Sequence, residues 1–468
     1  MKRPDASRRR FLRTASLLSP MGVAAPFALN LAAMGSAAAQ TSSDYRALVC
    51  LFMMGGNDHG NTVIATDPGS WSAYQTLRGA GSSPIALPAP GQPGGVLPIS
   101  PATAQPGRSF ALHPSLAPLQ QLFNAGQAAV VANVGPLLEP MTKAQYQANE
   151  NRRPSKLFSH NDQQSTWQAW GPEGARYGWG GRMGDMMAAM NGMQTFTCMA
   201  TSGNAVWLAG QDTLQYKVGS NGATPIRALT GSLYGSPMGA QVLQQIVTAD
   251  SANLFESAHA SVTRRAIDAQ ASLNAALIDA QGLEPLPTGA GNNGIAAQLN
   301  TVARIIGGRS SLSARRQVFF VSMGGFDTHD NQATKHAGLM AELAEAIAYF
   351  QRLLADPQIQ ATQQTTLFTA SDFGRTMTSN GDGTDHGWGG HHFVVGGAVR
   401  GGDIYGRFPE VGDGTNDDVG RGRLLPSVSV DQYAATMGRW FGLANGQLAD
   451  VFPNLGNFGA TQDLGFMT

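Results

Sequence analysis

The sequence is poor in charged residues and in cysteine for its length. Asp, Glu, Lys and Arg make up 13% of its 468 residues, about half the ~25% that soluble chains usually carry. Its two cysteines, Cys50 and Cys198, exclude a disulfide-framework miniprotein. Both lie in short apolar runs, so we expect buried thiols, with a disulfide as the alternative. The 42% share of apolar residues excludes a disordered chain, because that much apolar surface offsets the cost of ordering.

The N-terminal residues have the pattern of an export signal. Residues 7–13, Ser-Arg-Arg-Arg-Phe-Leu-Arg, match the twin-arginine pattern, and an uncharged stretch at 14–39 follows and ends in three alanines. Pro20 and Pro26 interrupt this stretch, which is typical of a signal rather than a stable membrane anchor. We therefore expect residues 1–39 to be a signal peptide read by the twin-arginine export machinery, and the mature protein to be periplasmic or secreted. A basic tail on a cytoplasmic protein is the alternative.

The charge of the mature chain argues against nucleic acid as a partner. Removing the signal takes away six basic residues and one acidic residue from the 31 of each kind. The remaining 25 basic and 30 acidic residues give a net charge of −5, and they form no basic run. Binding to nucleic acid depends on clustered Lys and Arg that contact phosphates, so no nucleic-acid partner is expected.

Short apolar runs alternate with helical patterns along the rest of the chain. The run at 48–54 ends in two glycines and is typical of a strand buried on both faces. Similar runs follow at 128–134, 195–200, 318–323, 367–370 and 393–395. Between them, apolar residues recur at helical spacing, as Leu339, Leu343 and Ile347 do. Strands separated by helices predict an α/β fold, a doubly wound and mostly parallel sheet with helices on both faces.

No linker or internal repeat divides the mature chain, so we expect residues 40–468 to form a single domain. Within it, the segment at 66–110 is rich in Gly, Pro and Ser and shows little periodicity, which predicts an irregular surface excursion. A long polar and apolar segment predicts a helical insertion at about 237–310.

Acidic residues and histidines gather just after the predicted strands or in the loop that leads to the last of them. They are Asp58, Asp327, His329, Asp372, Asp385, His386, His391 and His392. Ligands of open parallel sheets bind at the carboxyl ends of the strands, so these side chains are expected to share one site. Asp together with His suits Zn²⁺, Mn²⁺ or Fe, whereas Ca²⁺ and Mg²⁺ prefer oxygen ligands alone. The alternative is that the acids only cap helices.

These segments also carry a family resemblance. Gly-Gly-Asn-Asp at 55–58, Gly-Gly-Phe-Asp-Thr-His at 324–329, Ser-Asp-Phe-Gly-Arg-Thr at 371–376 and Asp-His-Gly-Trp-Gly-Gly-His-His-Phe at 385–393 together resemble the domain-of-unknown-function 1501 family. That resemblance spans nearly the whole mature chain. It implies a twin-arginine-exported member of the alkaline-phosphatase-like superfamily, with an alkaline-phosphatase-like sheet and a metal site at its carboxyl edge.

The resemblance also implies one or two divalent ions, with zinc expected and manganese or iron as alternatives. The implied ligands are Asp58, Asp327, His329, Asp372 and His386, with His391 or His392 as alternatives to His386 and Asp385 as the residue that orients it. Because their strands run parallel, these ligands are expected to converge. Phe373 stands where the superfamily pattern has a histidine, so the sequence departs from that pattern at this position.

The nucleophile of such enzymes is a Ser, Thr or modified Cys at a helix N-terminus. Ser159, followed by His160, is the best placed candidate for the catalytic group, and Thr62 is the second. Arg375 would clamp the anionic group of the substrate. Neither cysteine begins a Cys-x-Pro-x-Arg sequence, which argues against a formylglycine-type sulfatase.

The sequence thus predicts an exported, metal-dependent, hydrolase-like protein that acts on a phosphate or sulfate ester. Its substrate would be a small anionic ester or an anionic polymer, and another exported protein is a further candidate partner. The alternative is a non-catalytic periplasmic or envelope binding protein that retains a degenerate metal site.

Overall fold

The structure is a computed structural model. It describes residues 44–148, 153–219, 222–229, 232–233, 235–287 and 293–468. The expected signal peptide, 1–39, lies outside the described residues. The chain divides into two compact units, of which the second, Arg46–Thr468, contains the elements described here. None of the helices described has the length and apolar character needed to cross a membrane.

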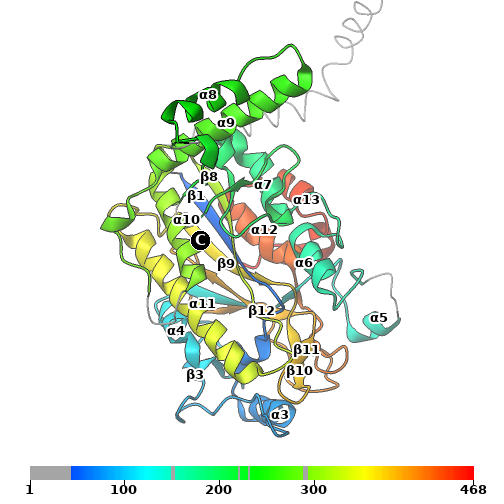
Figure 1. Ribbon diagram of the computed structural model, residues 1–468. Helices are drawn as coiled ribbons and strands as arrows, with labels where there is room; N and C mark the ends of the chain where they lie inside the picture. Colours follow the sequence, from blue (N-terminus) through cyan, green and yellow to red (C-terminus); the bar gives the residue numbers. More distant parts are fainter. Residues whose placement is uncertain (1–43, 149–152, 220–221, 230–231, 234, 288–292) are drawn as a thin grey trace, which may run out of the picture. The chain divides into compact units, whose positions relative to one another are not determined.

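A nine-stranded, largely parallel sheet forms the centre of this unit, in the order β13-β5-β12-β9-β1-β8-β6-β7 with β14 paired to β5 (Figure 1). Its strands are β1 Arg46–Met53, β5 Ala128–Gly135, β6 Cys198–Ala200, β7 Tyr216–Lys217, β8 Arg316–Met323, β9 Thr365–Ser371, β12 Gly390–Val395, β13 Ile404–Tyr405 and β14 Val428–Ser429. β1 pairs in parallel with both β8 and β9, whereas β12 is antiparallel to β5 and β9. The expectation of a mixed α/β fold with a mostly parallel sheet is confirmed.

The described part of the chain also contains helices. They are α3 Pro68–Arg78, α4 Ala117–Asn124, α5 Lys143–Ala148, α6 His160–Ala169, α7 Trp179–Met187, α8 Pro237–Val247, α9 Leu254–Ala276, α10 Gly294–Gly307, α11 Gln332–Ala355, α12 Val430–Phe441 and α13 Asn445–Val451. α12 begins with a capping box, in which Ser429 and Gln432 each accept a hydrogen bond from the backbone N–H of the other. Figure 1 shows α10 and α11 on one side of the sheet and α7, α12 and α13 on the other.

The packing of the core explains why the sequence of β1 is an unbroken apolar run. Leu48, Cys50 and Phe52 belong to one apolar cluster with Trp167 of α6, and residues of α7 and α12 complete it. The alternate residues of β1 are buried as well, so both faces of the strand are covered. Both cysteines are buried and free, and burial raises the pKa of the Cys198 thiol well above its usual value.

Two smaller sheets lie beside the central one. β2 Val63–Ala65, β4 Phe110–Leu112 and β3 Leu97–Ile99 form an antiparallel sheet, so the segment at 66–110 contains a strand as well as helix α3. β10 Arg375–Ser379 and β11 Thr384–His386 form an antiparallel pair directly after β9. Within the range 237–310, α8 and α9 contact each other, whereas α10 packs against β8 and α11.

Candidate metal and catalytic site

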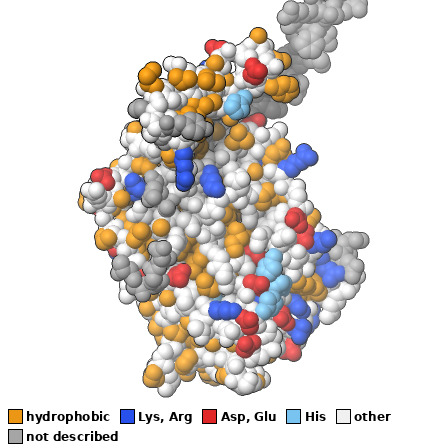
Figure 2. Space-filling view, viewed as in Figure 1, with side chains coloured by type: hydrophobic (Ala, Val, Ile, Leu, Met, Phe, Trp, Pro, Cys, Tyr) orange, Lys and Arg blue, Asp and Glu red, His pale blue; other side chains and the backbone are white. Residues whose placement is uncertain are grey.

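Polar residues from four separate segments meet at the carboxyl end of the central strands. Asp327 and His329 follow β8, Asp372 follows β9, His386 ends β11 and His160 begins α6. Figure 2 shows histidine and acidic side chains gathered on one face of the molecule, in the area where Figure 1 places β11. Gly55, just after β1, permits this convergence: its φ is +115°, and a Cβ there would lie 2.3 Å from the backbone nitrogen of Asp327.

Three ligand-type atoms form a small triangle. His329 Nε2 and His386 Nε2 lie 2.9 Å apart. Asp327 Oδ1 lies 3.1 Å from the first and 3.4 Å from the second. An ion with bonds of about 2.0–2.1 Å in tetrahedral geometry separates its donors by roughly 3.3–3.4 Å. The triangle is therefore close to the size that a single zinc-like ion requires.

The hydrogen bonds of His386 leave the correct nitrogen available to an ion. A backbone carbonyl only accepts, so the 2.8 Å contact of His386 Nδ1 with the Phe158 carbonyl makes Nδ1 the protonated nitrogen. Nε2 then carries the lone pair in the neutral ring, the arrangement that ligating histidines use. Burial is the main reason that the pKa of His386 is lowered, and this favours the neutral form. Asp385, expected beside His386, lies beside His329 instead, with Oδ1 at 3.6 Å from Nδ1.

Arg375 holds the carboxylate of Asp327 in place. Its Nη1 donates to Asp327 Oδ1 at 2.9 Å and to the Gly55 carbonyl at 2.9 Å, and its Nε donates to Thr384 Oγ1 at 2.9 Å. Burial acts to raise the pKa of Asp327, but the hydrogen bond and charge of Arg375 outweigh it, and the pKa is lowered. Arg375 is fully buried and hydrogen-bonded to these groups. Its contacts therefore indicate that it holds Asp327 in place rather than binding an anion from solvent.

His160 and Asp372 form a second polar pair beside the triangle. His160 Nδ1 lies 2.7 Å from Asp372 Oδ2, and this hydrogen bond raises the pKa of His160 despite partial burial. Asp372 is fully buried and also accepts from Gln164 Nε2 at 2.8 Å. His160 Nε2 has no hydrogen-bond partner among the described residues and faces Asp327 Oδ2 at 3.5 Å. His160, Asp327 and His386 offer donor atoms that all lie within 4.8 Å of one another.

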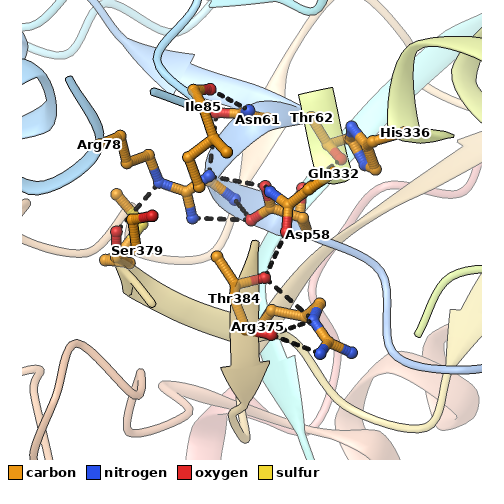
Figure 3. A network of polar contacts seen from close by, with 12 residues as sticks. Asp58, Asn61, Thr62, Arg78, Ile85, Gln332, His336, Arg375, Ser379 and Thr384 are labelled. Carbon is orange, nitrogen blue, oxygen red and sulfur yellow. Dashed lines mark hydrogen bonds and ion pairs between the residues drawn. The ribbon is translucent and has the colours of Figure 1, made fainter. Parts of the chain in front are cut away.

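Asp58 is bonded elsewhere, in a buried ion pair (Figure 3). Arg78 Nη1 lies 2.6 Å from Asp58 Oδ2, and Nη2 lies 2.7 Å from Oδ1. Gln332 Nε2 donates to Oδ2 at 2.5 Å. Burial opposes ionisation of Asp58, but the charge and hydrogen bonds of Arg78 lower its pKa well below the usual value. The structure thus gives both carboxylate oxygens protein partners and does not bring them into contact with the triangle.

A chain of hydrogen bonds nevertheless connects Asp58 to the site (Figure 3). Gln332, which donates to Asp58, accepts from Thr384 Oγ1 at 2.6 Å. Thr384 Oγ1 in turn accepts from Arg375, the residue that holds Asp327. Asp58 therefore supports the site through Gln332, Thr384 and Arg375. Sequence reasoning missed Arg78 and Gln332, because neither lies in a strand-end motif and only the folded chain brings them to Asp58.

The remaining predicted residues lie outside the triangle. Thr62 is buried and donates to the backbone carbonyl of Asp58 at 2.7 Å. Ser159 Oγ donates to Asp162 Oδ2 at 2.8 Å. His391 and His392 are buried in β12, where burial lowers the pKa of both.

The partners of the two β12 histidines account for their position. His391 Nδ1 accepts from the backbone N–H of Asn133 in the neighbouring strand, at 3.1 Å. His392 packs against the rings of Trp167 and Tyr433. Phe373, in contrast, lies at the site, with its ring 4.9 Å from that of His160 and 4.7 Å from that of His386. The Phe373 ring therefore lies beside these two histidines, at the position where the resemblance implied a histidine.

Fold and site together define an α/β protein with a cluster of histidines and acids at the carboxyl edge of its sheet. The sequence profile of the family described as protein of unknown function (DUF1501) matches residues 45–452. The chain belongs to this family. Comparison with curated proteins finds no match.

Solved structures resemble the chain only distantly. One, described as "Crystal structure of Ps i-CgsB", has a TM-score of 0.35 at 9% identity and covers 89% of this chain and 77% of that chain. Another comes from work on the metabolism of multiple glycosaminoglycans by Bacteroides thetaiotaomicron; its TM-score is 0.33 at 10% identity, covering 87% of this chain and 75% of that chain. At these TM-scores, neither similarity bears on the function of this chain.

Proposed function

We propose that this protein is a metal-dependent hydrolase of phosphate or sulfate esters. The observation that carries the proposal is the triangle of His329 Nε2, His386 Nε2 and Asp327 Oδ1, with sides of 2.9 to 3.4 Å. Two imidazoles and a carboxylate suit Zn²⁺, with Mn²⁺ or Fe as alternatives. When bound, such an ion polarises the ester oxygens and lowers the pKa of water.

His160 is the acid–base group of the proposed reaction. Its Nδ1–H donates to Asp372. This leaves Nε2, which is buried and has no hydrogen-bond partner in the described part of the chain, as the nitrogen that would take a proton from the attacking water and return it to the leaving group. Asp372 fixes the ring and stabilises its charged form, as the third group of a catalytic triad does. Arg375 keeps Asp327 ionised and in place.

The attacking group is proposed to be water rather than Ser159. The Ser159 hydroxyl donates to Asp162, outside the His160–Asp372 pair. We expect Ser159→Ala to retain turnover within about tenfold of the unmodified protein. Loss of turnover in this variant, with formation of a covalent intermediate only when Ser159 is present, would restore the serine as nucleophile.

Two finer assignments belong to the same proposal. An alkaline-phosphatase-like fold is supported by the parallel strands that carry Asp327 and Asp372 to one sheet edge. Export by the twin-arginine route to the periplasm or beyond is supported by Arg8, Arg9 and the weakly apolar stretch after them. Replacing both arginines with lysine is expected to hold the precursor in the cytoplasm.

The proposal is tested with purified mature protein loaded in turn with Zn²⁺, Mn²⁺ and Fe²⁺. We expect turnover of at least one of 4-nitrophenyl phosphate, bis(4-nitrophenyl) phosphate and 4-nitrophenyl sulfate. His160→Gln should lower kcat by roughly 10²-fold or more, the usual contribution of an acid–base residue. His259→Gln, at an exposed position of α9, is the matched control and should leave kcat unchanged. Metal binding without any turnover would favour the non-catalytic binding protein.

A further inference from the structure

A cavity adjoins the catalytic pair along one face of α6. Its volume is about 280 Å³, close to the lower end of the ~300–1,000 Å³ range of small-molecule sites. Asn161, Gln164, Ser165 and Gln168 line it from the helix. Their spacing of three and four residues places them on one helical face. His160 and Gln164 are also four residues apart, and both contact Asp372.

Gln164 joins this cavity to the site. Its side chain lines the cavity, and its Nε2 donates to Asp372 Oδ2 at 2.8 Å, the same oxygen that lies 2.7 Å from His160 Nδ1. Met54, directly after β1, contributes to the same lining. A group seated in the cavity is therefore a near neighbour of the His160–Asp372 pair.

The lining is rich in carboxamides and carries no positive charge. Asn204 also lines the cavity, and Glu173 is the one acidic side chain among the lining residues. Gln168 Oε1 accepts from the backbone N–H of Trp207, and Ser165 Oγ donates to the Pro172 carbonyl. These hydrogen bonds fix the side chains of Gln168 and Ser165 in the lining.

The two asparagines are available to a ligand. Asn161 and Asn204 are exposed, and neither side chain has a hydrogen-bond partner in the described part of the chain. Each offers one acceptor oxygen and two donor hydrogens. Such groups match hydroxyls, which also both donate and accept. The single carboxylate of Glu173 and the absence of cations from the lining disfavour an anionic occupant.

We propose that this cavity binds an uncharged, hydroxyl-rich ring, so that the substrate is a phosphate or sulfate ester of a sugar. The anionic ester group would lie at the histidine and acid cluster, and the sugar ring would lie along α6. The substrate assignment rests on the proposed hydrolase function, whereas the binding of a sugar ring does not.

Binding is tested first with neutral probes, methyl glucoside and methyl galactoside, by saturation-transfer NMR. We expect a signal with the unmodified protein and its loss in the Asn161→Leu/Asn204→Leu double variant, because leucines remove the free hydrogen-bonding groups and fill space. Asn445→Leu, an exposed position at the start of α13, is the matched control and should retain the signal. No signal for either probe with the unmodified protein would overturn the inference.

Turnover separates this inference from the proposed function. The double variant should lower kcat/KM for glucose 6-phosphate or glucose 6-sulfate roughly tenfold, as expected for two lost hydrogen bonds, and leave the aryl esters unchanged. Turnover of aryl esters without sugar binding contradicts only the inference. Sugar binding without turnover of any ester contradicts the proposed hydrolase function but supports the sugar-binding site.

Discussion

The protein is expected to unfold cooperatively as the pH falls from about 6 to about 4, with metal removed by a chelator. Five histidines are 1–3% exposed in the folded chain, namely His59, His113, His336, His391 and His392. Burial lowers the pKa of His59 and His336 to about 4 and that of His113 and His392 to about 3. The pKa of His391 is lowered too, for the same reason.

Proton binding by the unfolded chain explains why a fall in pH lowers the stability of the fold. An unfolded histidine has a pKa of about 6.5, so below that pH the unfolded chain binds protons that the folded chain does not bind. Their stability contribution is fully present above about pH 6.5 and is lost progressively as the pH falls toward the folded pKa values. Each such proton lowers the free energy of unfolding by roughly 1.4 kcal/mol per pH unit. Over one to two pH units, the combined loss from five such protons reaches a typical free energy of unfolding of about 5–15 kcal/mol.

One buried acid acts in the opposite direction. Burial raises the pKa of Asp431 to about 6, so the folded chain holds a proton there that the unfolded chain has released. For these six groups the net uptake on unfolding near pH 5 is therefore about four protons, and His386, whose pKa burial also lowers, acts in the same direction as the buried histidines. Urea unfolding at several pH values measures this number from the slope of stability against pH.

Two single variants make the acid prediction specific. His392 packs against the rings of Trp167 and Tyr433, and the variant His392→Phe should reduce the proton uptake on unfolding by about one proton. His259→Gln, exposed on α9, should leave it unchanged. A slope below two protons in the unmodified chain would contradict the burial of these histidines as neutral rings.

Asp58→Asn is expected to destabilise the fold by about 3–5 kcal/mol, the usual cost of leaving one partner of a buried ion pair unpaired. Arg78 would keep its charge with no carboxylate beside it, because its side chain and that of Asp58 are both 0% exposed. Equilibrium urea unfolding of the metal-free protein at pH 7 measures the effect.

The same substitution at the surface provides the control. Asp330 pairs with Lys335 in an exposed ion pair, so Asp330→Asn should cost less than about 1 kcal/mol. Asp58→Leu combined with Arg78→Met should recover part of the lost stability, because apolar replacements remove both charges but leave Gln332 Nε2 and the Thr376 and Met377 carbonyls without these partners. A direct metal ligand would give another result: Asp58→Asn would weaken metal binding and leave the metal-free protein about as stable as before.

The strands of the central sheet were predictable because both faces are buried. The runs at 48–54, 128–134 and 318–323 correspond to β1, β5 and β8. The β10–β11 pair was not predicted, since its polar residues show no alternation. It is nevertheless this pair that brings Thr384 and His386 to the ends of the parallel strands.

The sequence also located part of the site. Asp327, His329 and His386 come together, and Asp372 lies beside them through His160. Asp58 occupies the expected strand end, but its partner Arg78 comes from a segment without visible periodicity. His391 was an alternative to His386 in the sequence, and only the pairing of β12 with β5 places it in the core.

Anomalous diffraction at the zinc absorption edge, from crystals of the mature protein grown with equimolar Zn²⁺, tests the central claim most directly. We expect one strong peak, from an ion bonded to His329 Nε2, His386 Nε2 and Asp327 Oδ1 at about 2.0–2.2 Å. Data from crystals of the Asp327→Ala variant should lack this peak while the fold is retained. Full-occupancy zinc at Asp58, or no zinc within bonding distance of the two imidazoles, would contradict it.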